Sequence, residues 1–155
     1  MALYDFRDTA CAGQVADTMA SHRDTMFAGV DIPFGVIVGN LPDDTERRVT
    51  NKNFNRIIGV SARITTTEKD GYVTGEAVAV LTKGRVWVRA RYDVQFDFNL
   101  IGSDVYCDTT TGEYCLQGAD NAVKVDNAIV RSYAVQANQN LKLVELELHY
   151  PYMAN

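Results

Sequence analysis

The alternation of apolar and polar residues is strongest between Arg85 and Leu100. Every even-numbered position from Val86 to Leu100 is apolar or aromatic, whereas the odd-numbered positions other than Trp87 are polar or charged. Successive side chains of a β-strand point to opposite faces of the sheet, so a period of two predicts one buried and one exposed face. We therefore expect a strand over residues 85–100 with its even-numbered side chains in the core.

Shorter runs of the same kind predict further strands, and turn signals separate them. Asp70-Gly71 and Gly112 favour hairpin turns, and Lys83-Gly84 predicts a two-residue connection. In the hairpin around Gly112, the expected register places Cys107 opposite Cys115. The polar segment 40–55 predicts a long surface loop. Apolar or alternating runs cover residues 36–38, 56–67, 76–82, 105–107, 113–117, 128–136 and 141–150.

The fold class that follows is all-β, a compact antiparallel β-barrel or sandwich of short strands. The composition agrees, because 18 Val, 7 Ile and 13 Thr stand beside 10% aromatic residues, and β-branched and aromatic residues favour strands. A chain of 155 residues is long enough for one domain with a core.

Residues 1–31 lack sustained alternation, and aspartates punctuate a stretch of small residues. We expect an extended N-terminal arm there, followed by a single β-domain over residues 32–155. Two interpretations remain open: the arm docks on a neighbouring subunit, or it is a frayed terminus. Its apolar residues are too sparse to bury themselves, so we expect it to be ordered only by contact with another chain.

Charge and composition narrow the possible functions. A net charge of −5 disfavours a protein that binds nucleic acid by neutralising phosphates. The longest apolar run, Ala77–Leu81, is too short to cross a membrane, and the N-terminus lacks the plan of a signal peptide. We therefore expect a soluble protein made in a cytoplasm. Cys107 and Cys115 either form a disulfide or remain thiols, and a reducing cytoplasm favours thiols.

No motif for catalysis or cofactor binding is present. The sequence contains no nucleophile elbow, zinc-protease motif or glycine-rich phosphate loop. His22 and His149 have no histidine or cysteine at the spacing of metal ligands. We therefore expect a non-enzymatic protein without a metal ion or cofactor.

One basic segment stands out in this acidic chain. Lys83, Arg85, Trp87, Arg89 and Arg91 lie within nine residues that contain no acid, and the last four share one face of the predicted strand. An exposed indole among guanidinium groups suits docking onto an acidic protein surface or, less well, single-stranded nucleic acid. The alternative is a cross-strand ladder in which the arginines pair with carboxylates of a neighbouring strand.

Several segments in order resemble the small structural cement, or decoration, proteins of tailed-bacteriophage heads. The resemblance spans most of residues 10–148. Its segments are Ile32-Pro33-Phe34-Gly35-Val36, Ile58-Gly59-Val60, residues 75–88 (GEAVAVLTKGRVWV), Gly102-Ser103-Asp104-Val105-Tyr106, and a terminal pair of strands after Ala128.

This resemblance implies a β-domain with an N-terminal arm, bound to the outside of the capsid in the virion. There it would bridge major capsid protein subunits against internal DNA pressure. A homo-oligomer is expected, with a trimer favoured over a dimer, and no nucleic-acid or membrane partner. The alternative function is a carbohydrate- or receptor-binding β-module of a phage or bacterium that uses Trp87 and the tyrosines as stacking platforms. The interface candidates are Arg85, Trp87, Arg89, Arg91, Pro33 and Phe34.

Overall fold

The computed structural model describes residues 11–16, 21–41, 47–54, 56–63, 70–136 and 141–149. Nearly every regular element in this part is a strand, so the all-β prediction is confirmed. No helix among these residues is long and apolar enough to cross a membrane. The elements are β1 (Val15–Ala16), β2 (His22–Ala28), β3 (Ile32–Pro33), β4 (Ile37–Asn40), β5 (Arg48–Thr50), β6 (Ile57–Ser61), β7 (Gly71–Tyr72), β8 (Ala77–Arg89), the 3₁₀ helix η1 (Phe98–Leu100), β9 (Asp104–Asp108), β10 (Tyr114–Cys115), β11 (Ala122–Gln136) and β12 (Leu141–His149).

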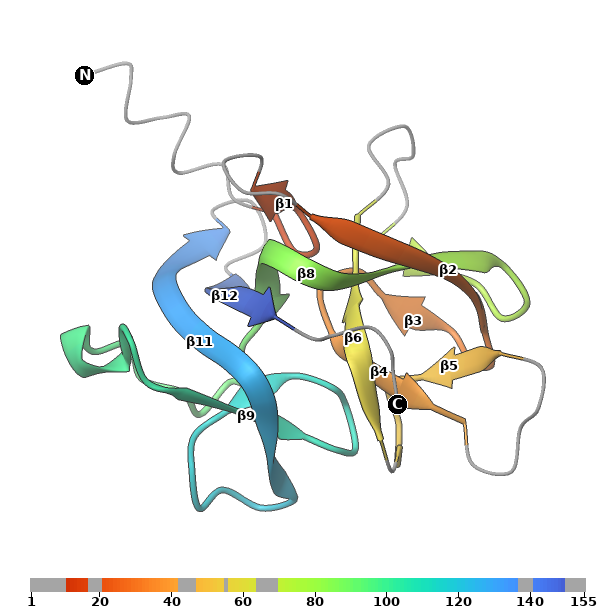
Figure 1. Cartoon of the computed structure of the whole chain (residues 1–155). Coiled ribbons are helices and arrows are strands. Elements are labelled where there is room, and N and C mark those ends of the chain that lie inside the picture. Colours follow the sequence, from red (N-terminus) through yellow and green to blue (C-terminus); the bar gives the residue numbers. More distant parts are fainter. Residues whose placement is uncertain are drawn as a thin grey trace.

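Strand β8 belongs to two closed rings of strands. In the first, the N-terminal ring, pairings run from β8 through β2, β5, β4 and β6 back to β8. In the second, the C-terminal ring, they run from β8 through β12, β11, β9 and β10. A parallel bridge between Ala90 and Tyr114 closes this ring. Figure 1 shows β2 to β6 on one side of the molecule, β9 and β11 on the other, and β8 between them.

Each ring has its own hydrophobic cluster. The cluster of the N-terminal ring contains Phe34, Val49 and Val80, and the small β3–β7 sheet adds Ile32 and Tyr72. The larger cluster fills the C-terminal ring and extends to residues of the N-terminal ring. It comprises Ile37, Phe54, Val60, Leu81, Val86, Val88, Ala90, Val94, Leu100, Val105, Cys107, Tyr114, Val125, Ala128, Val130, Val144, Leu146 and Leu148.

A β-bulge lets β8 serve both rings. Consecutive residues of β2, His22 and Arg23, pair with Lys83 and Leu81, so β8 carries one extra residue at this point. One extra residue exchanges the odd and even faces of a strand. For this reason Leu81 and Val86 face the same cluster. The connection predicted at Lys83-Gly84 is therefore wrong: these residues lie within a continuous strand.

The strand predicted over residues 85–100 ends at Arg89. The β8–β12 ladder stops there, and the next residues form a loop that leads into η1. Val94 and Leu100 are buried as predicted, but Tyr92 and Phe98 are 87% and 78% exposed. Without a partner strand the period of two no longer determines which side chains are buried.

Most of the described part of the predicted arm belongs to the β-domain. Residues 22–28 form β2, which pairs with β8 and β5. Ala12 is fully buried, and the Gly13 amide donates to the carbonyl oxygen of Trp87 at 2.7 Å. The expectation that the arm depends on another chain overlooked these main-chain bonds, which need few apolar side chains. Residues 1–10 lie outside the described part.

Three local predictions also differ in detail. The hairpin around Gly112 forms, with φ of +79° at the glycine, but Cys107 pairs with Tyr114 and not with Cys115. The two thiols therefore point to opposite faces, and both are buried and free. The polar segment 40–55 contains strand β5, in which Val49 is fully buried. Of the strand predicted over 56–67, residues 57–61 form β6, and residues 64–69 lie outside the described part.

Candidate interaction surface

Arg85, Trp87 and Arg89 lie on one face of β8, as predicted, and Arg91 follows just beyond the end of the strand. All four side chains are partly buried. The structure thus brings the predicted residues together, but it also gives each of them contacts within the chain.

Arg85 belongs to a cluster around Glu147 of β12. The Nε atoms of Arg85 and Arg131 lie 3.2 and 2.8 Å from Oε1 of Glu147, and Nε2 of His149 contacts the other carboxylate oxygen. The Glu147 side chain is only 10% exposed. The hydrogen bonds from Arg131 and His149 lower the pKa of Glu147 to about 2. Arg85 is therefore half of a cross-strand ion pair.

Trp87 and Arg89 contact segments whose main chain is hydrogen-bonded to β8, around residues 12–14 and 34–35. Trp87 packs against the small cluster of Ala12 and Leu143. The Nε of Arg89 donates to the carbonyl oxygen of Phe34 at 2.9 Å. Burial lowers the pKa of Arg89 from its ordinary value. Trp87 and Arg89 thus hold main-chain segments in place.

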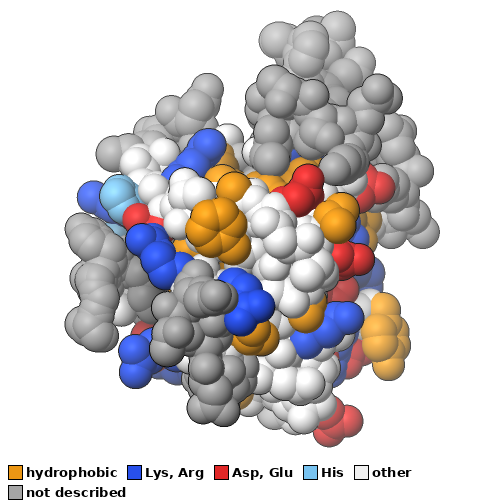
Figure 2. Space-filling model, turned by 90° about the vertical axis from the view of Figure 1, so that its right-hand side faces the viewer, with side chains coloured by type: hydrophobic (Ala, Val, Ile, Leu, Met, Phe, Trp, Pro, Cys, Tyr) orange, Lys and Arg blue, Asp and Glu red, His pale blue; other side chains and the backbone are white. Residues whose placement is uncertain are grey.

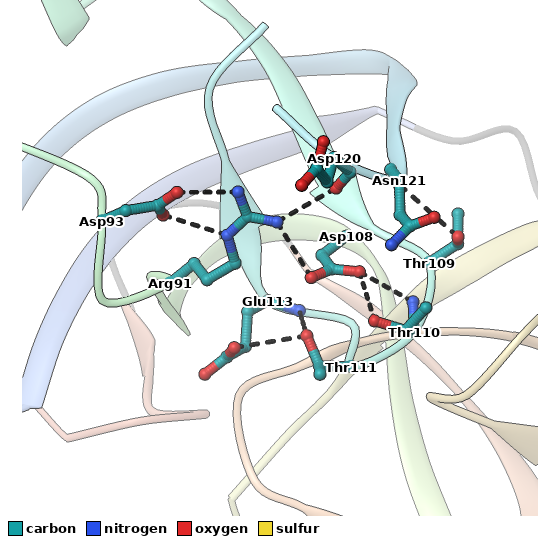
Figure 3. A network of polar contacts seen from close by, with 9 residues as sticks. All are labelled: Arg91, Asp93, Asp108, Thr109, Thr110, Thr111, Glu113, Asp120 and Asn121. Carbon is teal, nitrogen blue, oxygen red and sulfur yellow. Dashed lines mark hydrogen bonds and ion pairs between the residues drawn. The ribbon is translucent and has the colours of Figure 1, made fainter. Parts of the chain in front are cut away.

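Arg91 is the centre of a polar network (Figure 3). Its guanidinium binds both carboxylate oxygens of Asp93, at 2.9 and 2.8 Å, one oxygen of Asp108 at 3.1 Å, and the carbonyl oxygen of Asp120 at 3.0 Å. The hydrogen bonds to Asp93 and Asp108 raise the pKa of Arg91. Burial alone would raise the pKa of Asp108, but hydrogen bonds from Thr110 and Arg91 outweigh it and lower the pKa. The network joins the end of β8 to the β9–β10 turn.

The last two interface candidates lie in and next to β3 of the small β3–β7 sheet. Phe34 is fully buried and packs edge-to-face on Tyr72, with 5.1 Å between ring centroids. Its side chain belongs to the core of the domain, so its assignment to the surface is wrong. Pro33 is partly buried and lines a hollow of about 670 Å³ together with Asp31, Lys52 and other residues.

Figure 2 shows the face on the side of the N-terminal ring, where hydrophobic side chains appear as separate spots among charged and polar ones.

Among the described residues, no three His, Cys, Asp or Glu side chains gather closely enough to hold a metal ion.

Sequence reasoning missed two exposed aromatic side chains beyond β8, Tyr92 and Phe98. Period-two alternation assigned both residues to the core. A usable signal was present: Asp97 and Asn99 flank Phe98 and are typical turn and cap residues, and Gly102 follows soon after.

The comparisons with known proteins agree with the fold. A protein-family model described as structural cement protein (E217 gp24/Pam3 gp6) matches residues 3–149. The chain belongs to the phage structural cement protein family. A solved structure titled "The capsid of Myoviridae Phage XM1" contains a similarly folded chain, with a TM-score of 0.68 and 17% identity. The likeness covers 88% of this cement protein and 89% of that chain. None of the curated proteins matches it.

Proposed function

We propose that this cement protein binds the outer surface of a tailed-phage capsid and links neighbouring major capsid protein subunits. In this way it stabilises the head against the pressure of the packaged DNA. The family match over residues 3–149 carries the proposal, because it includes both rings of strands. The protein would then act as a non-enzymatic component of the virion, made in the host cytoplasm and added to the outside of the capsid.

The architecture supports a bridging role. A protein that links two subunits needs separate contact surfaces on a body that does not deform when loaded. The N-terminal and C-terminal rings provide two such bodies, and the continuous strand β8 connects them. Many copies on one capsid would add modest contacts together, because each further contact of an anchored protein forms at high effective concentration.

The odd face of β8, with Arg85, Trp87 and Arg89, is our proposed contact surface, and we keep Arg91 and Pro33 as further candidates. Interface cores are enriched in tryptophan and arginine, and these cations suit an acidic partner surface. Their partial exposure leaves part of each side chain accessible. Self-association through the same face, with a trimer favoured over a dimer, stays a prediction. Trp87 is less suited to stacking on a sugar, because it packs against Ala12 and Leu143.

The test uses capsids of the same phage prepared without this protein. Purified cement protein should bind them to saturation and raise the temperature at which they release DNA. Failure of the unmodified chain to bind would refute the proposed function.

The contact surface is tested by Trp87→Ala combined with Arg89→Ala, with folding verified by circular dichroism. The exposed Arg56 on the N-terminal ring provides a control, Arg56→Ala, that also removes one cation. Reduced occupancy for the double variant alone would support the surface. Equal occupancy for both variants and the unmodified chain would show that β8 carries only internal contacts.

A further inference from the structure

A hollow of about 650 Å³ lies in the C-terminal ring, between the loop after β8 and the β9–β10 hairpin. The buried residues Leu100 and Tyr114 form its floor. Phe96, Tyr106 and Leu116 also line it. We call this site the aromatic hollow. Its volume is in the range of pockets that receive a small ligand or a few side chains.

The loop that forms one side of the aromatic hollow exposes Phe98 beside it, and polar contacts fix this loop. Phe98, which is 78% exposed, lies between the lining residues Asp97 and Asn99. The ammonium group of Lys142 binds the carbonyl oxygen of Val94 at 2.6 Å, and Ser103 Oγ donates to the carbonyl oxygen of Leu100 at 2.6 Å. Arg91 and Asp93 fix the start of the same loop (Figure 3). An aromatic side chain carried on a fixed loop needs little ordering of the main chain on binding, so more of its burial contributes to affinity.

The charge at the aromatic hollow favours a cationic occupant. Its lining residues include Asp97 and Asp104, and no lysine, arginine or histidine among those the structure describes. Lys124 lies 3.7 Å from Asp104, but both side chains are more than half exposed, so the pair is weak. Lys142 lies near Phe96, but its ammonium group is already bonded to carbonyl oxygens of the loop. A lysine or arginine brought by a partner would therefore meet two carboxylates.

We propose that the aromatic hollow receives a short segment of the major capsid protein that presents a lysine or arginine beside an apolar side chain. This inference rests on the proposed function. The apolar side chain would pack against Phe98 and Leu116, and the cation would lie between Asp97 and Asp104. A second copy of this chain is a poorer occupant, because each copy carries a net charge of −5.

The experiment titrates capsids that lack the protein with the full chain and its variants, and measures occupancy by sedimentation. Phe98→Ala should weaken binding about tenfold or more, as truncation of a central interface aromatic does. Phe27, another exposed phenylalanine, lies on β2 in the N-terminal ring. Phe27→Ala should bind within about twofold of the unmodified chain, because it leaves the hollow intact. Both variants should melt close to the unmodified chain, since both side chains are exposed.

A second variant tests the charge. Asp97 accepts a hydrogen bond from the Asn99 amide at the start of η1. Asparagine caps this turn equally well, so Asp97→Asn with Asp104→Asn removes charge and preserves the loop. Capsid binding of the unmodified chain should weaken as salt rises from about 50 to about 500 mM, and the double variant should respond less. A photo-crosslinker in place of Phe98 should attach to the major capsid protein.

The outcomes separate the two proposals. If the unmodified chain binds and Phe98→Ala binds equally well, the aromatic hollow is not a contact site, whereas the proposed function stands. Crosslinking of position 98 to a second copy of this chain would also overturn the inference. If the unmodified chain does not bind capsids, both the function and the occupant of the hollow are refuted.

Discussion

Replacement of Glu147 by glutamine should make the stability of the protein less sensitive to acid. In the folded chain, Arg85, Arg131 and His149 surround the Glu147 carboxylate. The pKa of this carboxylate is about 2, against 4.5 for an unperturbed glutamate. Glu147→Gln retains one acceptor oxygen for Arg85 and Arg131, removes the charge, and places an amide NH2 where the oxygen next to His149 was. The variant therefore reports mainly the contribution of ionisation.

The magnitude follows from linkage. A group whose pKa is lower in the folded state stabilises the fold above its unfolded pKa and loses this contribution as the pH falls towards the folded value. A difference of 2.5 pKa units, from 4.5 to about 2, corresponds to about 3 kcal/mol at most. Solvent screens the partly exposed guanidinium groups of Arg85 and Arg131, so we expect about 1–2 kcal/mol. Most of this should be lost between about pH 5 and pH 2.5.

The assay is urea unfolding at pH 6 and pH 3, monitored by tryptophan fluorescence. Between these pH values the unmodified protein should lose about 1 kcal/mol more free energy of unfolding than Glu147→Gln. Taking the difference cancels the carboxylates that both proteins share. Glu145→Gln is the control: Glu145 lies two residues away on β12 and accepts a hydrogen bond from Ser132. Equal acid sensitivity of the unmodified protein and Glu147→Gln would refute the reasoning.

Two further predictions concern the polar network and the cysteines. Arg91→Ala should reduce the free energy of unfolding by about 2 kcal/mol, because it leaves the buried Asp108 without its cation. Asp93→Asn removes only the charge of the more exposed partner and should cost under about 1 kcal/mol. Urea unfolding of both variants measures the difference, and equal costs would contradict the prediction. Burial raises the pKa of Cys107 to about 12 and that of Cys115 to about 11. In the native protein at pH 8, a thiol reagent should therefore label the partly exposed Cys11 well before it labels Cys107 or Cys115. Mass spectrometry after brief labelling checks this order.

Alternation along the chain predicted the fold class because one face of a paired strand packs on the core, as in β12, where Val144, Leu146 and Leu148 are buried. The same rule failed at Tyr92 and Phe98, which have no partner strand. The bulge in β8 depends on its pairing with β2, a long-range contact that a local pattern does not contain.

The candidate surface was predictable only in part. The sequence places Arg85 and Trp87 on one face, but the partners Glu147 and Leu143 come from β12, more than fifty residues away. Phe34 was an interface candidate, yet it is fully buried and packs on Tyr72 of β7, a contact between residues far apart in the sequence. The aromatic hollow arises from two loops that meet only in the folded chain.

The strand common to both rings also determines how the molecule bears mechanical force. Hydrogen bonds between antiparallel strands lie perpendicular to the chain direction. A load that pulls the two rings apart along β8 would therefore act in shear, and the bonds of the β8–β12 ladder, from Lys83–His149 to Arg89–Leu143, would have to break together. A load that peels the strands apart would break the same bonds one after another. Under the proposed function, the orientation of β8 relative to the capsid surface would therefore decide whether this protein acts as a strong tether or a weak one.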